Sequence, residues 1–139
     1  MQYGYFAAAD DADVVRILDR FDEQAEGTGH LELVVKHADP LEDLLPAELS
    51  LTGRTEAELE ADPRRGKFLG EIHDGELAVL ALSDVFKQAL SQASDADLRA
   101  AAVAIAGPAD AEDLVSFLKS LSEMARRDAS HHLYCWISL

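Results

Sequence analysis

The sequence predicts a single α+β domain spanning residues 1–139, in which a small mixed or antiparallel sheet packs against several helices. Three strand signals support this class: an aromatic segment at the N-terminus, a hairpin signal in the middle and an alternating apolar segment at the C-terminus. Helical patterns separate these signals along the chain. A chain of 139 residues has the usual length of one domain and can bury a core without disulfides.

The first quarter of the chain predicts a strand and then a helix. Aromatic residues within Gln2–Ala8 favour a short strand. Asp10 and Asp11 can cap the helix that follows, which runs to about Gln24. Its apolar residues recur at helical spacing: Val14, Ile17, Leu18 and Phe21.

The next segment mixes strand and helix signals. Alternation over His30–His37 predicts a second strand. A helix is expected from Asp39–Pro40, and Pro46 either interrupts it or begins another short one. Thr55 and Glu58 have the spacing of a capping box, and a polar loop covers 62–66.

The hairpin and the last third of the chain give clear signals. Strands at Phe68–Ile72 and Leu77–Leu82 flank an Asp-Gly turn, whose glycine tolerates a positive φ. Three helices should follow, the first two capped by Ser83 and Ser94 and the longest starting at Asp110. Leu133–Leu139 then predicts a final buried strand, whose core face holds Leu133, Cys135, Ile137 and Leu139, which leaves Tyr134 and Trp136 on the other face.

The charge of the chain restricts its partners. Its 27 acidic residues against 12 basic ones give a net charge of -15, which repels nucleic acids and anionic membranes. A basic protein would be attracted, although the charge also serves solubility alone. Cys135 is the single cysteine, and neither a signal peptide nor an apolar membrane segment is recognisable. These features predict a cytoplasmic protein.

Recognisable motifs for phosphate, dinucleotide, zinc or nucleophilic chemistry are absent from the sequence. We therefore predict no catalytic, cofactor-binding or metal-binding residue and no cofactor. Cys135 is expected to be a buried structural cysteine, and the histidines are expected at the surface or at strand edges. Arg64, Arg65 and Lys67 form the densest basic cluster, for which solvated cations are favoured over a small anion site or an intramolecular dock.

One group of residues could form a pocket. Aromatic residues lie near both chain ends, with a histidine beside the second group: Tyr3, Tyr5, His132, Tyr134 and Trp136. If the two terminal strands are neighbours, these side chains could line one cavity. Packing in the core is the favoured alternative for Tyr134 and Trp136.

Several segments resemble the YfbM-like family of bacterial domains. The similar segments are Tyr3-Gly4-Tyr5, Leu51-Thr52-Gly53, Gly66–Ile72 with the hairpin that follows, and the long helix with the strand Leu133–Leu139. The segment Pro46–Leu49 departs from the family pattern, in which aromatic and basic residues are common. The resemblance implies an α+β fold and carries no activity or functional residue to this chain.

Three hypotheses about function remain open. The first is a protein-interaction or regulatory module with an acidic binding surface, of which an immunity-like protein that neutralises a basic toxin is one form. The second is a small-molecule-binding protein or an enzyme of unfamiliar type, with its pocket near the terminal strands. The third is a subunit of a homo-oligomer.

Overall fold

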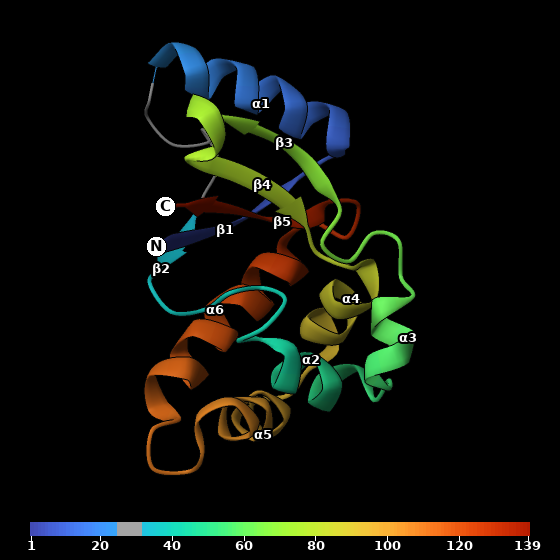
Figure 1. Ribbon diagram of the computed structural model, residues 1–139. Helices are drawn as coiled ribbons and strands as arrows, with labels where there is room; N and C mark the ends of the chain where they lie inside the picture. The colour runs from blue at the N-terminus through green and yellow to red at the C-terminus, as the bar shows by residue number, and fades with distance from the viewer. Residues whose placement is uncertain (25–31) are drawn as a thin grey trace.

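A five-stranded antiparallel sheet forms the middle layer of the part of the chain that the structure describes (Figure 1). The computed structural model describes residues 1–24 and 32–139. The strand order is β2-β1-β5-β4-β3. The strands are β1 Gln2–Ala8, β2 Leu33–Val35, β3 Phe68–Ile72, β4 Leu77–Ala81 and β5 His132–Ser138.

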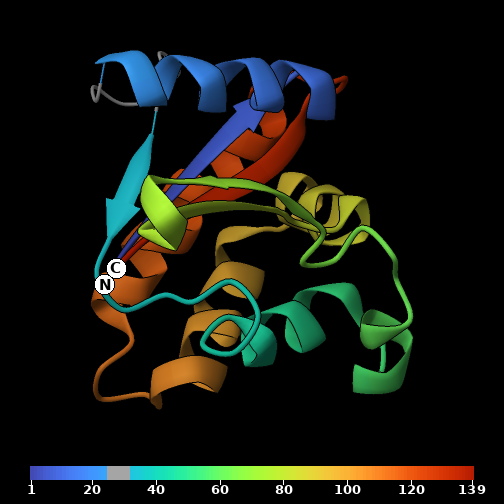
Figure 2. The same ribbon diagram turned by 45° about the horizontal axis from the view of Figure 1, so that its top comes forward.

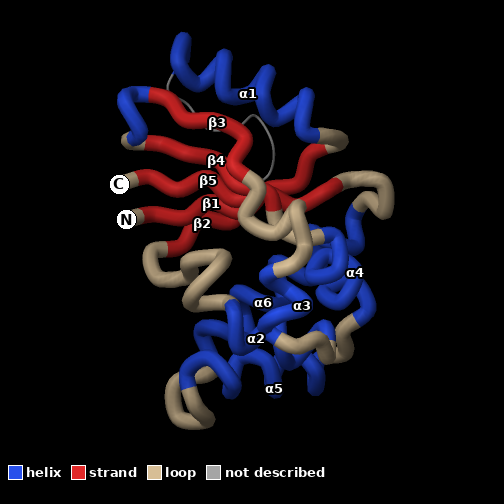
Figure 3. Tube along the Cα trace, turned by 45° about the vertical axis from the view of Figure 1, so that its right-hand side comes forward, coloured by secondary structure: helices blue, strands red, loops and turns tan. Residues whose placement is uncertain are grey.

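Helices cover both faces of this sheet (Figures 1 and 3). Helix α1 lies on one face, and α4 and α6 lie against the other, with α2 and α5 packed on them. The helices are α1 Asp11–Gln24, α2 Leu45–Thr52, α3 Glu56–Glu60, α4 Asp84–Gln92, α5 Asp95–Ala106 and α6 Glu112–Arg127. The predicted α+β class, with an N-terminal strand, a central hairpin and a C-terminal strand, is therefore confirmed.

The C-terminal strand lies at the centre of the sheet. Strand β5 pairs with β1 on one side and with β4 on the other, so the last strand of the chain joins the first strand to the hairpin. The two chain ends lie side by side in Figures 1 and 2. The predicted final buried strand is confirmed, with bounds shifted by one residue.

The predicted alternation along β5 and the favoured core packing of Tyr134 and Trp136 are confirmed, but both faces of the strand are buried, not one core face alone. Leu133 and Cys135 pack in the larger core, between the sheet and the helices on its α4 and α6 side. Tyr134 and Trp136 pack in a second core, under α1. Leu139, expected on the core face, follows the strand and is 73% exposed. A sheet covered on one face leaves alternate residues in solvent, whereas a sheet covered on both faces buries them all.

Most of the predicted helix ends and turns are confirmed. Thr55 and Ser94 form capping boxes, and the Ser83 side chain accepts a hydrogen bond from the Phe86 backbone N–H. The hairpin turn includes Asp74 and Gly75, both with positive φ. These local interactions satisfy backbone donors that the first turn of a helix leaves unpaired.

Other predicted elements differ in their bounds, and β4 ends one residue early, at Ala81 instead of Leu82. The helix expected from Asp39 is a turn: the Asp39 side chain accepts the N–H groups of residues 41 and 42, but the Leu44 N–H bonds to the Asp39 carbonyl, five residues back rather than the four of an α-helix. The helix begins instead at Leu45, with Pro46 in its first turn, where the missing N–H costs nothing. The longest helix starts at Glu112 rather than Asp110. Strand β2 covers only Leu33–Val35 of the predicted segment, and His30, Leu31 and the Phe21 side chain lie outside the described residues.

No helix in the described part of the chain is both long enough and apolar enough to cross a bilayer.

Candidate functional site

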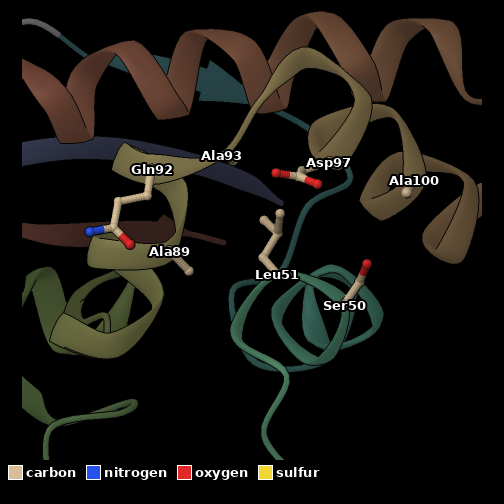
Figure 4. A pocket seen from close by; sticks show the side chains of 7 residues that line it. All are labelled: Ser50, Leu51, Ala89, Gln92, Ala93, Asp97 and Ala100. Carbon is tan, nitrogen blue, oxygen red and sulfur yellow. The ribbon is translucent and has the colours of Figure 1, made fainter.

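A groove lies between α2, α4 and α5, and Figure 4 shows one of its two cavities. This cavity has a volume of about 320 Å³. It combines small or apolar residues with polar ones: Ser50, Leu51, Ala89, Gln92, Ala93, Asp97 and Ala100. In Figure 4 the Leu51 side chain points towards the first turn of α5, where Asp97 lies. The groove thus offers an apolar surface next to a carboxylate.

A second cavity, of about 440 Å³, continues the groove. It shares Leu51, Ala89 and Gln92 with the first. The rest of its lining is Thr52, Arg54, Asp84, Val85 and Gln88. Because the two cavities share three residues, they form one groove with Asp97 towards one end and Asp84 towards the other.

Helix capping sets the charge at the Asp97 end of the groove. The Ser94 backbone N–H donates to Asp97 Oδ2 at 3.0 Å, and the Asp97 N–H donates to Ser94 Oγ at 3.1 Å. The backbone and side-chain hydrogen bonds from Ser94 lower the pKa of the Asp97 carboxyl. Asp97 therefore stays ionised at neutral pH.

At the other end, the groove adjoins a cluster of paired charges around Asp11, which we call the Asp11 cluster (Asp11, Arg64, Lys67, Asp84, His132 and Tyr134). Arg64 donates to both Asp11 oxygens, at 3.0 and 3.3 Å, and Lys67 Nζ donates to Oδ2 at 2.9 Å. The Tyr134 hydroxyl donates to Oδ1 at 2.8 Å. The Arg64 guanidinium also lies over the Tyr134 ring, 5.4 Å from its centroid, so the cluster joins α1, the 62–67 loop and β5.

Burial and pairing have opposite effects on the carboxyl of Asp11. Burial alone raises its pKa, but hydrogen bonds from Arg64, Lys67 and Tyr134 outweigh this and hold the pKa well below its usual range. Burial, followed by the hydrogen bond to Asp11, raises the pKa of the Tyr134 hydroxyl. Asp11 is therefore a permanent anion and Tyr134 a neutral donor at physiological pH.

Asp84 connects the Asp11 cluster to the groove. Its Oδ1 lies 2.6 Å from His132 Nδ1 and 3.4 Å from Arg64 Nε. The Arg64 distance is that of an ion pair, without the alignment of a hydrogen bond, and Nε is otherwise unpartnered among the described residues. An imidazole held by a carboxylate can act as an acid or base when its other nitrogen faces a substrate. Among the described residues, however, His132 lies outside the lining of both cavities, so this geometry favours a structural link.

The structure separates the predicted pocket residues. Tyr3 and Tyr5 pack in the core on the α6 side of the sheet, whereas Tyr134 and Trp136 pack under α1. Tyr134 and His132 both join the Asp11 cluster, through Arg64 and its carboxylate partners.

The reason lies in the register of the two terminal strands. They are neighbours, as the hypothesis required, but Tyr3 and Tyr5 pair with Ile137 and Cys135 rather than with aromatic residues. Directly paired residues share a face, and their sequence neighbours point the other way. The four aromatic rings therefore do not line a common pocket, and this basis for a small-molecule site is removed.

The prediction for the basic cluster is also corrected. Arg65 Nε lies 3.0 Å from both oxygens of Glu48, which is 2% exposed, and Arg65 also donates to the Leu41 carbonyl at 3.1 Å. Together with the Arg64 and Lys67 bonds to Asp11, this shows an intramolecular dock rather than solvated cations. The loop is fixed to α2 and to α1 by ion pairs.

Sequence reasoning missed the groove, Glu48 and the pairing partners of Arg64. Asp11 and Arg64 are 53 positions apart, and no spacing rule links them. The one usable signal was the concentration of cations in 64–67 of an acidic chain, since buried or half-buried cations need carboxylate partners. Among the side chains that the structure describes, no three from His, Cys, Asp or Glu are placed to hold a metal ion.

Comparison of the chain with protein-family models, with curated proteins and with solved structures gave no match.

Replacement of Asp11 by asparagine should destabilise the protein at neutral pH by about 1.5 to 3 kcal/mol, because charged hydrogen bonds are lost. The folded state lowers the Asp11 pKa, so its contribution is complete above the unfolded value of about 4 and is lost as pH falls below it. The difference between wild type and Asp11→Asn in urea unfolding should therefore shrink on acidification. Asp19→Asn, on the exposed side of the same helix, should change stability by less than about 0.5 kcal/mol. A difference that stayed constant down to low pH would contradict this role of Asp11.

Proposed function

We propose that the chain is a protein-interaction or regulatory module of the cytoplasm, which binds a basic protein in the groove between α2, α4 and α5. The observation that carries the proposal is the groove itself, in which small apolar residues lie beside Asp97 and Asp84. Neutralising a basic toxin or enzyme would be one specific form of this function.

The charge balance of the surface supports a basic partner. Many of the described cations are already held within the chain by carboxylates or carbonyls: Arg16, Arg64, Arg65, Lys67, Lys87, Arg99 and Lys119. With a net charge of -15, acidic groups dominate the field around the protein. Such a field speeds the approach of a basic protein and repels an acidic one.

The shape of the groove supports a protein segment as the ligand. Ala89, Ala93 and Ala100 have short side chains, so the backbone of a bound segment can approach the helices closely. Leu51 supplies an apolar contact, and the ionised Asp97 at one end can meet Lys or Arg, whereas Asp84 at the other end already pairs with His132 and Arg64. Binding of an amphipathic segment between helices is a recurring mode of recognition.

The experiment compares two arginine substitutions at exposed alanines. Ala100→Arg places a long cation in the groove, while Ala109→Arg places the same side chain in the turn after α5, outside the groove lining. Wild type and both variants are used to capture proteins from the native host, and the captured partner is then titrated in purified form. We expect a basic partner whose affinity falls at least about tenfold for Ala100→Arg and is kept by Ala109→Arg.

Salt provides a second readout. The affinity should fall as ionic strength rises, because exposed charges are screened beyond about 8 Å at physiological salt. A partner that is not basic, or one whose binding is equal for the two arginine variants, would count against the proposed function.

A further inference from the structure

Among the described strands, β2 forms one edge of the sheet. It is the last strand in the order β2-β1-β5-β4-β3, and within the described part of the chain it pairs with β1 alone. Figure 2 shows it at the margin of the sheet. An edge strand presents backbone N–H and C=O groups that a further strand can bind. Its central residue, Val34, is also 47% exposed, so the edge carries an apolar side chain.

A cavity of about 220 Å³ lies between β2 and α6. Its lining comes from the start of β2 and from one stripe of α6 at helical spacing: Glu32, Leu33, Ser120, Glu123, Met124 and Arg127. Leu33 and Met124 give it an apolar part. A strand added to β2 would therefore have space for a side chain on the α6 side.

The sequence of this edge complements itself. In an antiparallel pairing of two β2 strands centred on Val34, Leu33 lies opposite the Val35 of a second copy, and Glu32 lies opposite its Lys36. Paired residues share a face of the sheet. The Val35 of the second copy would therefore lie on the α6 side, next to the cavity. The two Val34 side chains would meet on the other face. A two-fold axis repeats each of these contacts.

The charges at this edge favour contact between two copies of the chain, although the chain as a whole is acidic. The Glu32 carboxylate accepts a hydrogen bond from Trp136 Nε1 at 3.0 Å through Oε1, which holds it near the edge. In this pairing the Lys36 ammonium of the second copy lies opposite that carboxylate, so the two opposite charges attract. Lys36 itself is exposed.

We infer that β2 is a dimerisation edge, at which two copies of the chain pair antiparallel about Val34 and join their sheets. The inference uses a different surface from the α2–α4–α5 groove and does not depend on the proposed function.

The test combines mass measurement with site-specific cross-linking. Wild type should change from monomer towards dimer in sedimentation equilibrium between about 1 μM and about 1 mM. Val34→Lys should weaken the dimer at least about tenfold, because it places two cations opposite each other at the edge. Its cooperative thermal unfolding, measured in parallel, separates this effect from misfolding.

Cysteine cross-linking locates the contact. Val34→Cys should form a covalent dimer under mild oxidation, since Cα atoms of directly paired residues lie within disulfide range at about 4.5 to 5.5 Å. Val15→Cys, a similarly exposed position on α1, is the control and should stay monomeric. The native Cys135 is buried. A wild type that is monomeric throughout, a dimer unaffected by Val34→Lys, or equal cross-linking of the two cysteine variants would overturn the inference.

Discussion

A chain that lacks Leu133–Leu139 is expected to lose cooperative folding altogether. Strand β5 is hydrogen-bonded on one side to β1 and on the other to β4, so its removal breaks the sheet in two. It also removes buried side chains from both cores: Leu133, Tyr134, Cys135 and Trp136. A native protein has only about 5 to 15 kcal/mol of stability, and the loss of several large buried side chains exceeds this.

Circular dichroism during heating measures this effect. The truncated chain should show no cooperative thermal transition, whereas deletion of Leu139 alone should leave one, because that residue follows β5 and is exposed. A cooperative transition in the chain without Leu133–Leu139 would refute the central role of β5.

The substitution Gly4→Ala is expected to destabilise the protein severely for a single added methyl group. Gly4 lies opposite Trp136 in the β1–β5 pair, and a Cβ at this position would be 2.0 Å from Trp136 Cε2 and 2.2 Å from Nε1. The indole would have to move, and its hydrogen bond to Glu32 would be disturbed. Overpacking of this kind costs about 1 to 3 kcal/mol of stability, and loss of the hydrogen bond from the displaced indole to Glu32 adds to this cost.

A double-mutant cycle isolates the steric cause. Trp136→Ala alone should cost about 3 to 5 kcal/mol, because a large aromatic side chain is removed from a core. In that background Gly4→Ala should cost far less than in wild type, since the colliding ring is absent. The measurement is the free energy of unfolding in urea for all four proteins. Equal costs of Gly4→Ala in both backgrounds would show that the ring does not set the requirement for glycine.

Elements defined by neighbouring residues were predicted well. Capping boxes at Thr55 and Ser94, the Asp-Gly turn and the amphipathic stripe of α6 all depend on contacts within a few positions. Alternation placed the terminal strand, and its central place in the sheet follows from the pairing with β1 and β4. The start of α2 was misplaced, because Asp39 caps a turn whose backbone bond spans five residues and the helix follows only at Leu45.

The candidate site was much harder to predict, because its parts come from distant segments. The groove combines residues 50–54, 84–93 and 97–100, and its lining holds no motif. Small residues such as Ala89 and Ala100 become informative only when three helices place them together. The partners of Arg64 and Arg65 were hidden for the same reason, since many carboxylates along the chain were equally suitable on spacing alone.

By itself, the sequence determined the α+β class, the order of strands and helices, and an acidic surface that restricts the choice of partners. Local periodicity and net charge are properties of the chain, so no tertiary contact is needed to predict them. Only the tertiary structure decided that α1 covers the second face of the sheet, which buries Tyr134 and Trp136 and divides the aromatic residues between two cores. Alternation shows which residues share a face of β5, but which faces meet other elements depends on packing between segments far apart in the chain.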